Sequence, residues 1–307
     1  MKKLLAVATV LAMGVLISAC GSAGGEPAPA GTPAAGQATA TRIILATPTP
    51  QPAPPTPTPI PPTPTPEATA AAGQSQEPQA PSVTDMMLQI PAGPFTMGSD
   101  EADPEDAPAQ EVDVPAFEID EFEVTNADFA TFSEATGYVT YAEKQGLNNW
   151  RGEWGPGEDN HPVVAVTWED ALAYCVWLGK RLPTEAEWEK AARGEDGRRF
   201  PWGNDWDANR ANVKERGLRG TAAAGSFGEG ASPYGVEDMT GNVWEWTADW
   251  YQPYPGNTVE DPYYGEKFRV TRGGGWFDVE AQSTTFNRNA ADPTKTANDD
   301  LGFRCAR

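Results

Sequence analysis

The sequence after about residue 82 predicts a loop-rich α+β domain. Helix-start signals are few, and between them Gly, Pro, Asn and Asp recur every few residues, which favours short strands and long ordered loops. All eleven tryptophans lie between Trp150 and Trp276. A stretch of about 225 residues with so many large apolar side chains is long enough to bury one sizeable core.

Three helices are predicted, each after a threonine whose hydroxyl can accept a hydrogen bond from the first helical turn. They are Asn126–Ala135 after Thr125, Trp168–Leu178 after Thr167, and a helix after Thr184 that Gly194 can end. The strongest signal is TEAE, where a glutamate three residues after the threonine makes a capping box. The remaining segments are predicted to be short strands and loops.

Residues 1 to 19 are typical of a secretory signal. A basic start precedes an apolar run from Leu4 to Ile17, which is too short to be a convincing membrane span. Small residues then lead to Cys20, as in a bacterial lipobox, whose cysteine becomes the lipidated first residue. The alternative is an ordinary cleaved signal followed by an incidental cysteine. The lipobox interpretation predicts an extracytoplasmic protein that is lipid-anchored to the cell membrane, on the cell surface or the periplasmic face.

Residues 20 to 82 are predicted to be the lipidated cysteine and a linker rich in Pro, Thr and Ala. They contain almost no large apolar side chains and include the run Pro48 to Pro66, so they cannot bury a core. Such a composition favours polyproline conformation, which at about 3.1 Å per residue makes a semi-rigid spacer. A Pro-rich ligand for a recognition domain is the alternative. The folded domain is therefore expected over residues 83 to 307.

The domain is strongly acidic. The chain has 22 Lys and Arg against 44 Asp and Glu, and the first 82 residues hold three of each sign, so the net charge of −22 belongs to the domain. Such a surface repels nucleic acid and anionic lipid, and it suits divalent cations, basic partners or neutral ligands, or serves solubility alone. His161 is the only histidine, which excludes a histidine-rich metal site.

Three long segments of the domain resemble one known family. They are HPVVAVTWEDALAYCVWLGKRLPTEAEWEKAARG (His161 to Gly194), YGVEDMTGNVWEWTADWY (Tyr234 to Tyr251) and RGGGWFDVEAQSTTFNRNAADPTKTANDDLGFRCAR (Arg272 to Arg307). In this order they resemble the formylglycine-generating enzymes, or sulfatase-modifying factors, and chance explains three such segments far less readily than one short motif. The resemblance covers about residues 85 to 307. It implies the formylglycine-generating-enzyme fold with a C-type-lectin-like core.

Two cysteines remain once Cys20 is assigned to lipid, namely Cys175 and Cys305. Two cysteines in an exported protein tend to pair, and the alternative is two buried reduced thiols. The resemblance adds that the matching cysteines, in AYC and GFRC, are partners in the family. A bridge between them would leave no free thiol for chemistry.

The resemblance also implies a chemistry for which this sequence lacks the residues. Family members oxidise a substrate cysteine with molecular oxygen at a copper(I) ion held by two thiolates, the soft ligands that select this ion. Alignment from Gly273 puts Asp278 and Ser283 at the two cysteine positions and Gly275 at a nearby serine. Carboxylate and hydroxyl groups hold copper(I) poorly. No copper cofactor and no copper-dependent oxidase activity are therefore expected.

The calcium ligands of the family are better preserved. One set, with two side-chain oxygens and two backbone carbonyls, maps onto Asp238, Gly241, Val243 and Glu245. Ca²⁺ prefers such hard oxygen donors, whereas the alternative role for Glu245 is to pair with a buried arginine. A second set maps onto Asn212, Val213 and Leu218. Arg216 replaces the aspartate of that set, and because an arginine cannot ligate a cation, this second site is not carried over intact.

Polar and aromatic residues of the C-terminal segment are expected to line the groove that holds the substrate in the family. They are Trp276, Asp278, Glu280, Ser283, Asn287 and Arg288. Such side chains suit a peptide, a partner protein or a glycan, although a solvated loop has the same composition. The alternative for Arg288 is contact with a structural carboxylate, and Arg304, beside Cys305, is expected to form a buried ion pair.

The sequence thus predicts a membrane-tethered member of this family that is non-catalytic and binds a peptide, protein or glycan in the former substrate groove. One alternative is an enzyme with different, thiol-independent chemistry at the same groove, where Asp278 would act as a base. Another is a scaffold protein of the cell envelope.

Overall fold

The structure, a computed structural model, describes residues 86–101, 103–294 and 298–307. The predicted signal, the lipidated Cys20 and the linker lie outside the described residues. No helix among the residues that the structure describes is long and apolar enough to cross a membrane.

The three predicted helices are confirmed and begin at the predicted threonines. They are α1 (Asn126–Thr136), α4 (Trp168–Trp177) and α5 (Glu185–Arg193). The hydroxyl of Thr184 accepts a hydrogen bond from the backbone N–H of Glu187, and the Glu187 carboxylate accepts one from the N–H of Thr184. Helix α5 ends at Gly194, whose φ of 73° suits a residue without a side chain. The caps therefore fix where these helices start.

Two short helices were not predicted, α2 (Tyr141–Gln145) and α3 (Trp150–Glu153). Thr140 and Glu143 form a capping box at the start of α2, so the signal for this helix is present in the sequence. A helix of five residues is too short to show an apolar repeat, and the cap was the only available signal. Single 3₁₀ turns occupy η2 (Pro104–Asp106), η3 (Ala208–Arg210), η4 (Lys214–Arg216) and η5 (Gly228–Gly230).

The strands form two antiparallel pairs and one mixed sheet. One pair joins β1 (Met87–Ile90) to β4 (Phe117–Asp120), and the other joins β2 (Gly93–Met97) to β3 (Gln110–Val114). The mixed sheet has the order β7-β6-β5-β8, built from Arg288–Ala291, Arg269–Arg272, Trp244–Trp250 and Leu301–Gly302. Strand β8 runs parallel to β5, whereas the other neighbours are antiparallel. The described part of the chain thus combines helices with short strands, as predicted.

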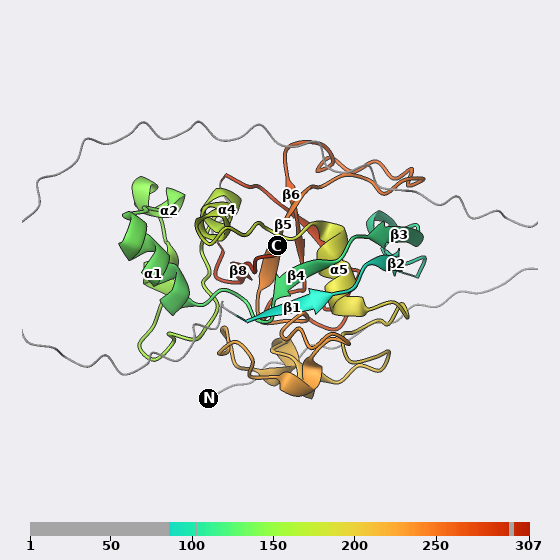
Figure 1. Ribbon diagram of the computed structural model, residues 1–307, viewed down its shortest axis with the longest axis horizontal. Helices are drawn as coiled ribbons and strands as arrows, with labels where there is room; N and C mark the ends of the chain where they lie inside the picture. Colours follow the sequence, from blue (N-terminus) through green and yellow to red (C-terminus); the bar gives the residue numbers. More distant parts are fainter. Residues whose placement is uncertain (1–85, 102, 295–297) are drawn as a thin grey trace, which may run out of the picture. The chain divides into compact units, whose positions relative to one another are not determined.

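The apolar core has two parts. One lies between α1, α4 and the mixed sheet, where Phe129, Tyr174, Trp246 and Phe303 are buried. The other packs α5 against the two strand pairs, around Trp188. In Figure 1, α1, α2 and α4 lie together on the left, whereas β2 and β3 lie on the right next to α5.

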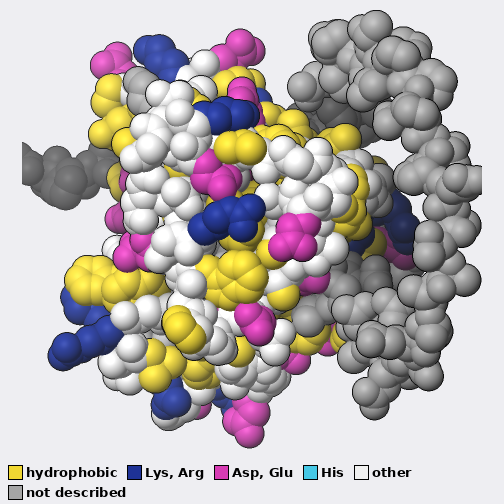
Figure 2. Space-filling model, turned by 90° about the vertical axis from the view of Figure 1, so that its left-hand side faces the viewer, with side chains coloured by type: hydrophobic (Ala, Val, Ile, Leu, Met, Phe, Trp, Pro, Cys, Tyr) yellow, Lys and Arg dark blue, Asp and Glu magenta, His cyan; other side chains and the backbone are white. Residues whose placement is uncertain are grey.

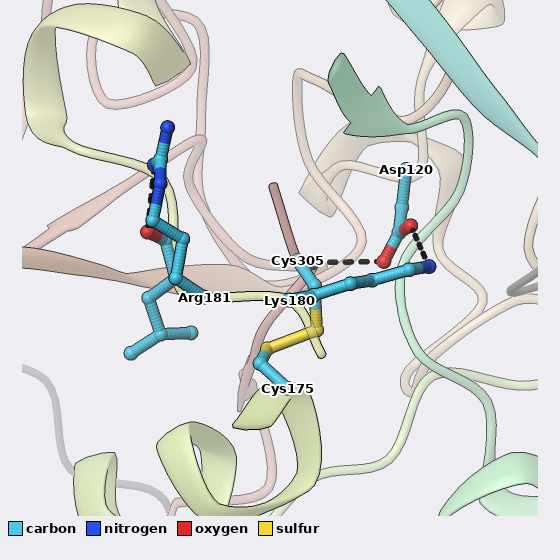
Figure 3. Close-up of a disulfide and its surroundings, with 6 residues drawn as sticks. Asp120, Cys175, Lys180, Arg181 and Cys305 are labelled. Carbon is cyan, nitrogen blue, oxygen red and sulfur yellow. Dashed lines mark hydrogen bonds and ion pairs between the residues drawn. A yellow bond between two sulfur atoms is a disulfide. The ribbon is translucent and has the colours of Figure 1, made fainter. Parts of the chain in front are cut away.

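Cys175 and Cys305 form the predicted disulfide, which ties α4 to the last residues of the chain. Figure 3 shows Asp120 beside this bridge. One oxygen of its carboxylate pairs with Lys180 Nζ over 2.6 Å, and the other accepts the backbone N–H of Cys305 over 2.9 Å. A covalent bond and a buried ion pair thus secure the C-terminal segment to α4 and β4.

Large apolar side chains also reach the surface. In and next to α1, α2 and α4 they include Val139, Leu147 and Trp177. Figure 2 shows this side of the molecule, where hydrophobic side chains stand between basic and acidic ones.

Candidate functional site

The mixed sheet separates two environments, because successive side chains of a strand point to opposite faces. Glu245, Arg272 and Arg288 occupy one cross-strand row, since Glu245 pairs with Arg272 and Arg272 pairs with Arg288. These three charged residues therefore share one face of the sheet. Their neighbours Thr271 and Asn289, which also pair with each other, occupy the opposite face.

The charged face packs against α5 and is fully buried. The Arg272 guanidinium contacts the carboxylates of Glu185, at 3.7 Å, and Glu189. Arg288 donates to both oxygens of Glu185, over 2.8 and 2.9 Å. Arg288 therefore contacts a structural carboxylate, the alternative that the sequence left open, because strand alternation turns it inward, where only 1% of its side chain is exposed.

The opposite face carries a cavity of about 340 Å³. Its lining comes from all four strands of the mixed sheet and from the loops around them. The lining residues are Trp244, Phe268, Thr271, Asn289, Ala290, Ala291, Asp292, Asn298, Asp300 and Leu301. This cavity is the candidate binding site of the described residues.

Asp278 stands next to this cavity and is held in place by two donors. Its Oδ2 accepts a hydrogen bond from Trp244 Nε1 over 2.8 Å and another from the Gly275 N–H over 2.8 Å. Its backbone carbonyl accepts the N–H of Lys214. Burial, then the charges of Asp299 and Asp278, raise the pKa of Asp300 in the cavity wall to about 6. Asp278, where the resemblance leads us to expect a copper thiolate, thus lies beside the cavity and is hydrogen-bonded to Trp244 of its wall.

Ser283, one of the predicted groove residues, is fully buried and does not belong to the lining of the cavity. Its hydroxyl donates to the Val279 carbonyl over 3.0 Å, and its own carbonyl accepts the hydroxyl of Thr240. These bonds shape the loop that follows Asp278. Ser283 therefore has a structural role inside that loop.

The other predicted groove residues lie on the loop but not in the cavity wall. Trp276 is half-buried and its indole donates to the Asp299 carbonyl over 3.4 Å, Asn287 is half-buried, and Glu280 is exposed. Sequence reasoning missed Trp244, Asn289 and Asp300, which do line the cavity. The available signal was the alternation of side chains along a strand, which places Asn289 on the face opposite to that of Arg288.

Two of the predicted calcium residues, Asp238 and Glu245, lie near a third buried carboxylate, that of Glu123. Asp238, Glu245 and Glu123 are all buried, and one oxygen of Glu123 has no hydrogen-bond partner. Burial, and then the charges of Asp238 and Glu245, raise the pKa of Glu123 well above its usual range. Burial also raises the pKa of Asp238 to about 6. Glu123 was not predicted, because it lies far from the others in sequence.

Glu245 is paired with a buried arginine, the alternative that the sequence left open. Arg304 donates to both of its oxygens, over 2.8 and 2.7 Å, and Trp188 Nε1 donates to Oε2 over 2.8 Å. The buried ion pair predicted for Arg304 is therefore confirmed. The Arg304 guanidinium also interacts electrostatically with the carboxyl groups of Glu123 and Asp238.

Backbone geometry at Gly241 also fits the expected ligand set. Gly241 has a φ of 75°, and a Cβ atom there would meet the Asn212 carbonyl at 2.3 Å. This close approach brings the two predicted ligand segments together. Among the described residues, no group of three His, Cys, Asp or Glu could hold a metal ion by side chains alone. A cation here would therefore need carbonyl oxygens, such as those of Gly241 and Val243.

The residues of the second predicted calcium set make other contacts or are exposed. Asn212 is buried and its Oδ1 has no partner, Val213 is buried, and Leu218 is 53% exposed. Arg216 donates to Asn209 over 2.8 Å and lies over the ring of Phe227.

Comparisons with known proteins agree with this architecture. The family model of the sulfatase-modifying factor enzyme 1-like domain matches residues 72–307. The formylglycine-generating enzyme of Mus musculus is 36% identical over 303 residues, which cover 76% of this chain and 80% of that protein. The inactive C-alpha-formylglycine-generating enzyme 2 of Mus musculus is 38% identical over 275 residues, which cover 72% of this chain and 85% of that protein.

Among solved structures, PvdO from Pseudomonas aeruginosa superposes with a TM-score of 0.60 at 29% identity. The match covers 72% of this chain and 93% of PvdO. The predicted fold class, the loop-rich formylglycine-generating-enzyme fold with its C-type-lectin-like core, is thereby confirmed.

Proposed function

The chain belongs to the sulfatase-modifying factor family, and we propose that it is a non-catalytic member that binds a peptide, protein or glycan in the cavity beside Asp278. The observation that carries this proposal is the contact between Asp278 and Trp244. It supports the proposal because Asp278, where the resemblance leads us to expect a copper ligand, carries a carboxylate and is hydrogen-bonded to a residue of the cavity wall.

Loss of the thiols supports the non-catalytic role. The only cysteines after Cys20 are Cys175 and Cys305, and these two are joined and buried. Copper(I) requires soft ligands, and the residues around the cavity offer oxygen donors instead. A relative of similar identity is itself described as inactive, which is compatible with a family branch that retains the fold without the reaction.

A thiol-independent enzyme is supported less well. The oxygen Oδ2 of Asp278 already accepts two hydrogen bonds, from Trp244 Nε1 and from the Gly275 N–H. Asp278 is therefore held as a fixed part of the binding wall, which supports a binding role more than a role as a base.

We also propose a structural Ca²⁺ held by Asp238, Glu245 and the carbonyls of Gly241 and Val243. Glu123 would contribute a further oxygen, because one of its carboxylate oxygens has no other partner. The ion would supply positive charge to a buried cluster in which Arg304 is the one paired cation. Its role would be to hold β5 and the preceding loop in place beside the cavity.

The predicted lipid anchor at Cys20 and the Pro-rich linker complete the proposal. They would hold the domain outside the cytoplasm, at a distance from the membrane. The acidic surface argues against nucleic acid as a partner.

Two assays test the proposal in parallel: one for oxidation of a peptide and one for retention of a binding partner. The full-length protein is incubated with a cysteine-containing sulfatase peptide and copper, with an active formylglycine-generating enzyme as positive control. No thiol-to-aldehyde mass change is expected from this protein. Retention of a partner from envelope extract is compared with the variant Asn289→Trp, which places a large side chain on the cavity face of the sheet. Peptide oxidation by the wild type, or unchanged retention by the variant, would contradict the proposal.

A further inference from the structure

We propose that a second surface, next to the cavity, binds an acidic peptide segment that also carries apolar side chains. This surface, the basic patch, lies on the loop of residues 214–219 and on the part of the C-terminal segment that follows Trp276. Its members are Lys214, Arg216, Leu218, Arg219, Phe277 and Val279. The inference goes beyond the proposed function, because it concerns another surface and does not require a ligand in the cavity.

Backbone and side-chain contacts bring the two parts of the basic patch together. The Lys214 N–H donates to the Asp278 carbonyl over 3.0 Å, and Lys214 Nζ lies 4.5 Å from the centroid of the Phe277 ring. At the base of the loop, the buried amide of Asn212 donates to the Gly220 carbonyl over 2.9 Å. The two ends of the loop are thus held together, and all six residues between them are exposed.

The cations of the basic patch form no ion pairs. Among the residues that the structure describes, no carboxylate pairs with Lys214, Arg216 or Arg219. Three cations and one carboxylate give residues 214–219 a net charge of +2, although the net charge of the chain is −22. The loop is therefore a local positive site on an acidic domain, and it attracts carboxylates.

Apolar side chains stand among these cations. Phe277, at 58%, is the most exposed large apolar side chain of the described residues, and Leu218 and Val279 are also exposed. The edge of Trp276 packs against the Phe277 ring, with the ring centroids 5.7 Å apart, which supports the ring from behind. Exposed apolar groups that lie together are typical of a binding surface. A ligand that combines carboxylates with apolar side chains would therefore match both features of the patch.

The acidic surroundings favour a narrow ligand over an extended anionic surface. Glu215 lies within the loop, and Glu280 follows Val279. A membrane or a nucleic acid duplex would bring its charges close to these carboxylates and to other acidic groups of the domain, within a Debye length of about 8 to 10 Å. A single peptide segment can contact the cations alone. The positive loop therefore suits an acidic peptide better than an anionic lipid surface.

Fluorescence anisotropy on the full-length protein tests the inference with two labelled dodecapeptides. In one peptide aspartate alternates with leucine, and in the other asparagine replaces aspartate. The acidic peptide should bind at least about tenfold more tightly than the asparagine peptide, and added salt should weaken its binding. The variant Arg216→Gln with Arg219→Gln should weaken it by about tenfold. The control is Lys144→Gln with Lys267→Gln, which changes the net charge equally at exposed sites outside the patch and should leave binding unchanged.

Two further variants separate a binding role from a loss of structure. Glu215→Gln removes the one carboxylate of the loop and should strengthen binding of the acidic peptide by about threefold, a gain that misfolding would not produce. Phe277→Ser should weaken binding by about fivefold. Its control is Tyr263→Ser, at another exposed aromatic residue, which should have no effect.

Three results would overturn the inference. One is equal affinity for the acidic and the asparagine peptide, and another is equal weakening by the two double variants. The third is a short-chain phosphatidylglycerol, used as the monomer, that binds with the expected dependence on Arg216 and Arg219 while the acidic peptide does not. Retention of a partner by Asn289→Trp measures the cavity separately, so failure here would leave the proposed function standing.

Discussion

The indole Nε1 of Trp244 donates a hydrogen bond to the Asp278 carboxylate over 2.8 Å. This bond joins strand β5 to the loop in which the resemblance places the copper thiolates. It fixes a carboxylate against the wall of the cavity, where an oxidase of this family would need a soft ligand. The same contact therefore joins the position at which the resemblance leads us to expect a copper thiolate to the wall of the cavity.

Copper(I) binding should be absent from the wild type and should return when both thiols are restored. The double variant Asp278→Cys with Ser283→Cys provides the two soft ligands that the ion requires. Competition with a chromophoric copper(I) chelator measures the affinity. Asp278→Cys alone is the control, because one thiolate should hold the ion much less tightly. Equal copper binding by the single and double variants would show that position 283 is not the second ligand.

The disulfide should contribute substantially to stability. Linking residues 130 apart removes conformational freedom from the unfolded chain, an effect of roughly 4 to 5 kcal/mol in the chain-entropy model. Reductant, or Cys175→Ala with Cys305→Ala, should lower the melting temperature by calorimetry. Reductant should have no further effect on the double variant. A wild type that melts at the same temperature with and without reductant would contradict this expectation.

Removal of calcium should destabilise the domain. An ion bound only to the folded state adds about 2.7 kcal/mol when its concentration is 100 times its Kd. A chelator should therefore lower the melting temperature, and added Ca²⁺ should restore it. Glu123→Gln should reduce the response to the ion, while Glu229→Gln, on the exposed η5 turn, should not. If elemental analysis finds no calcium and a chelator does not change the melting temperature, the proposed calcium site is refuted.

Asp106 should make stability fall as the pH rises. The residue is 1% exposed, neither carboxylate oxygen has a hydrogen-bond partner, and burial raises its pKa to about 8 despite Arg272 and Arg288 nearby. In the unfolded chain this carboxyl titrates near about 4. Between the two values the folded state holds a proton that the unfolded state releases, so the free energy of unfolding decreases with pH.

Asp106→Asn isolates this effect, because the amide resembles the protonated acid and does not titrate. The variant should be more stable than the wild type at about pH 9, on the order of a few kcal/mol, and the difference should shrink towards about pH 5. Urea denaturation at both pH values measures it. A stability difference that does not change with pH would show that Asp106 is not held protonated by burial.

Cys20→Ser should abolish lipidation. The variant should be released from the membrane fraction or remain unprocessed, because the apolar signal run is too short for a convincing span. Mass spectrometry of the mature N-terminus and fractionation measure the outcome. A wild-type protein found as a soluble, unlipidated mature form would contradict the anchor.

The sequence by itself determined the features that depend on local chemistry or on residue identity. Thr125, Thr167 and Thr184 located three helices, because capping is decided within four residues of chain. That Asp278 and Ser283 stand at the two copper-cysteine positions was predicted from the sequence and the resemblance, without any coordinates. The pairing of Cys175 with Cys305 was expected because few cysteines were available.

Only the tertiary structure decided which side of the mixed sheet each residue faces. Arg288 and Asn289 are neighbours, yet one is buried against Glu185 and the other lines the cavity, because alternate side chains of a strand leave on opposite faces. The wall formed by Trp244, Asn289 and Asp300 comes from strand β5, strand β7 and the residue just before strand β8. Strand pairing brings them together, and no local sequence pattern predicts which strands pair.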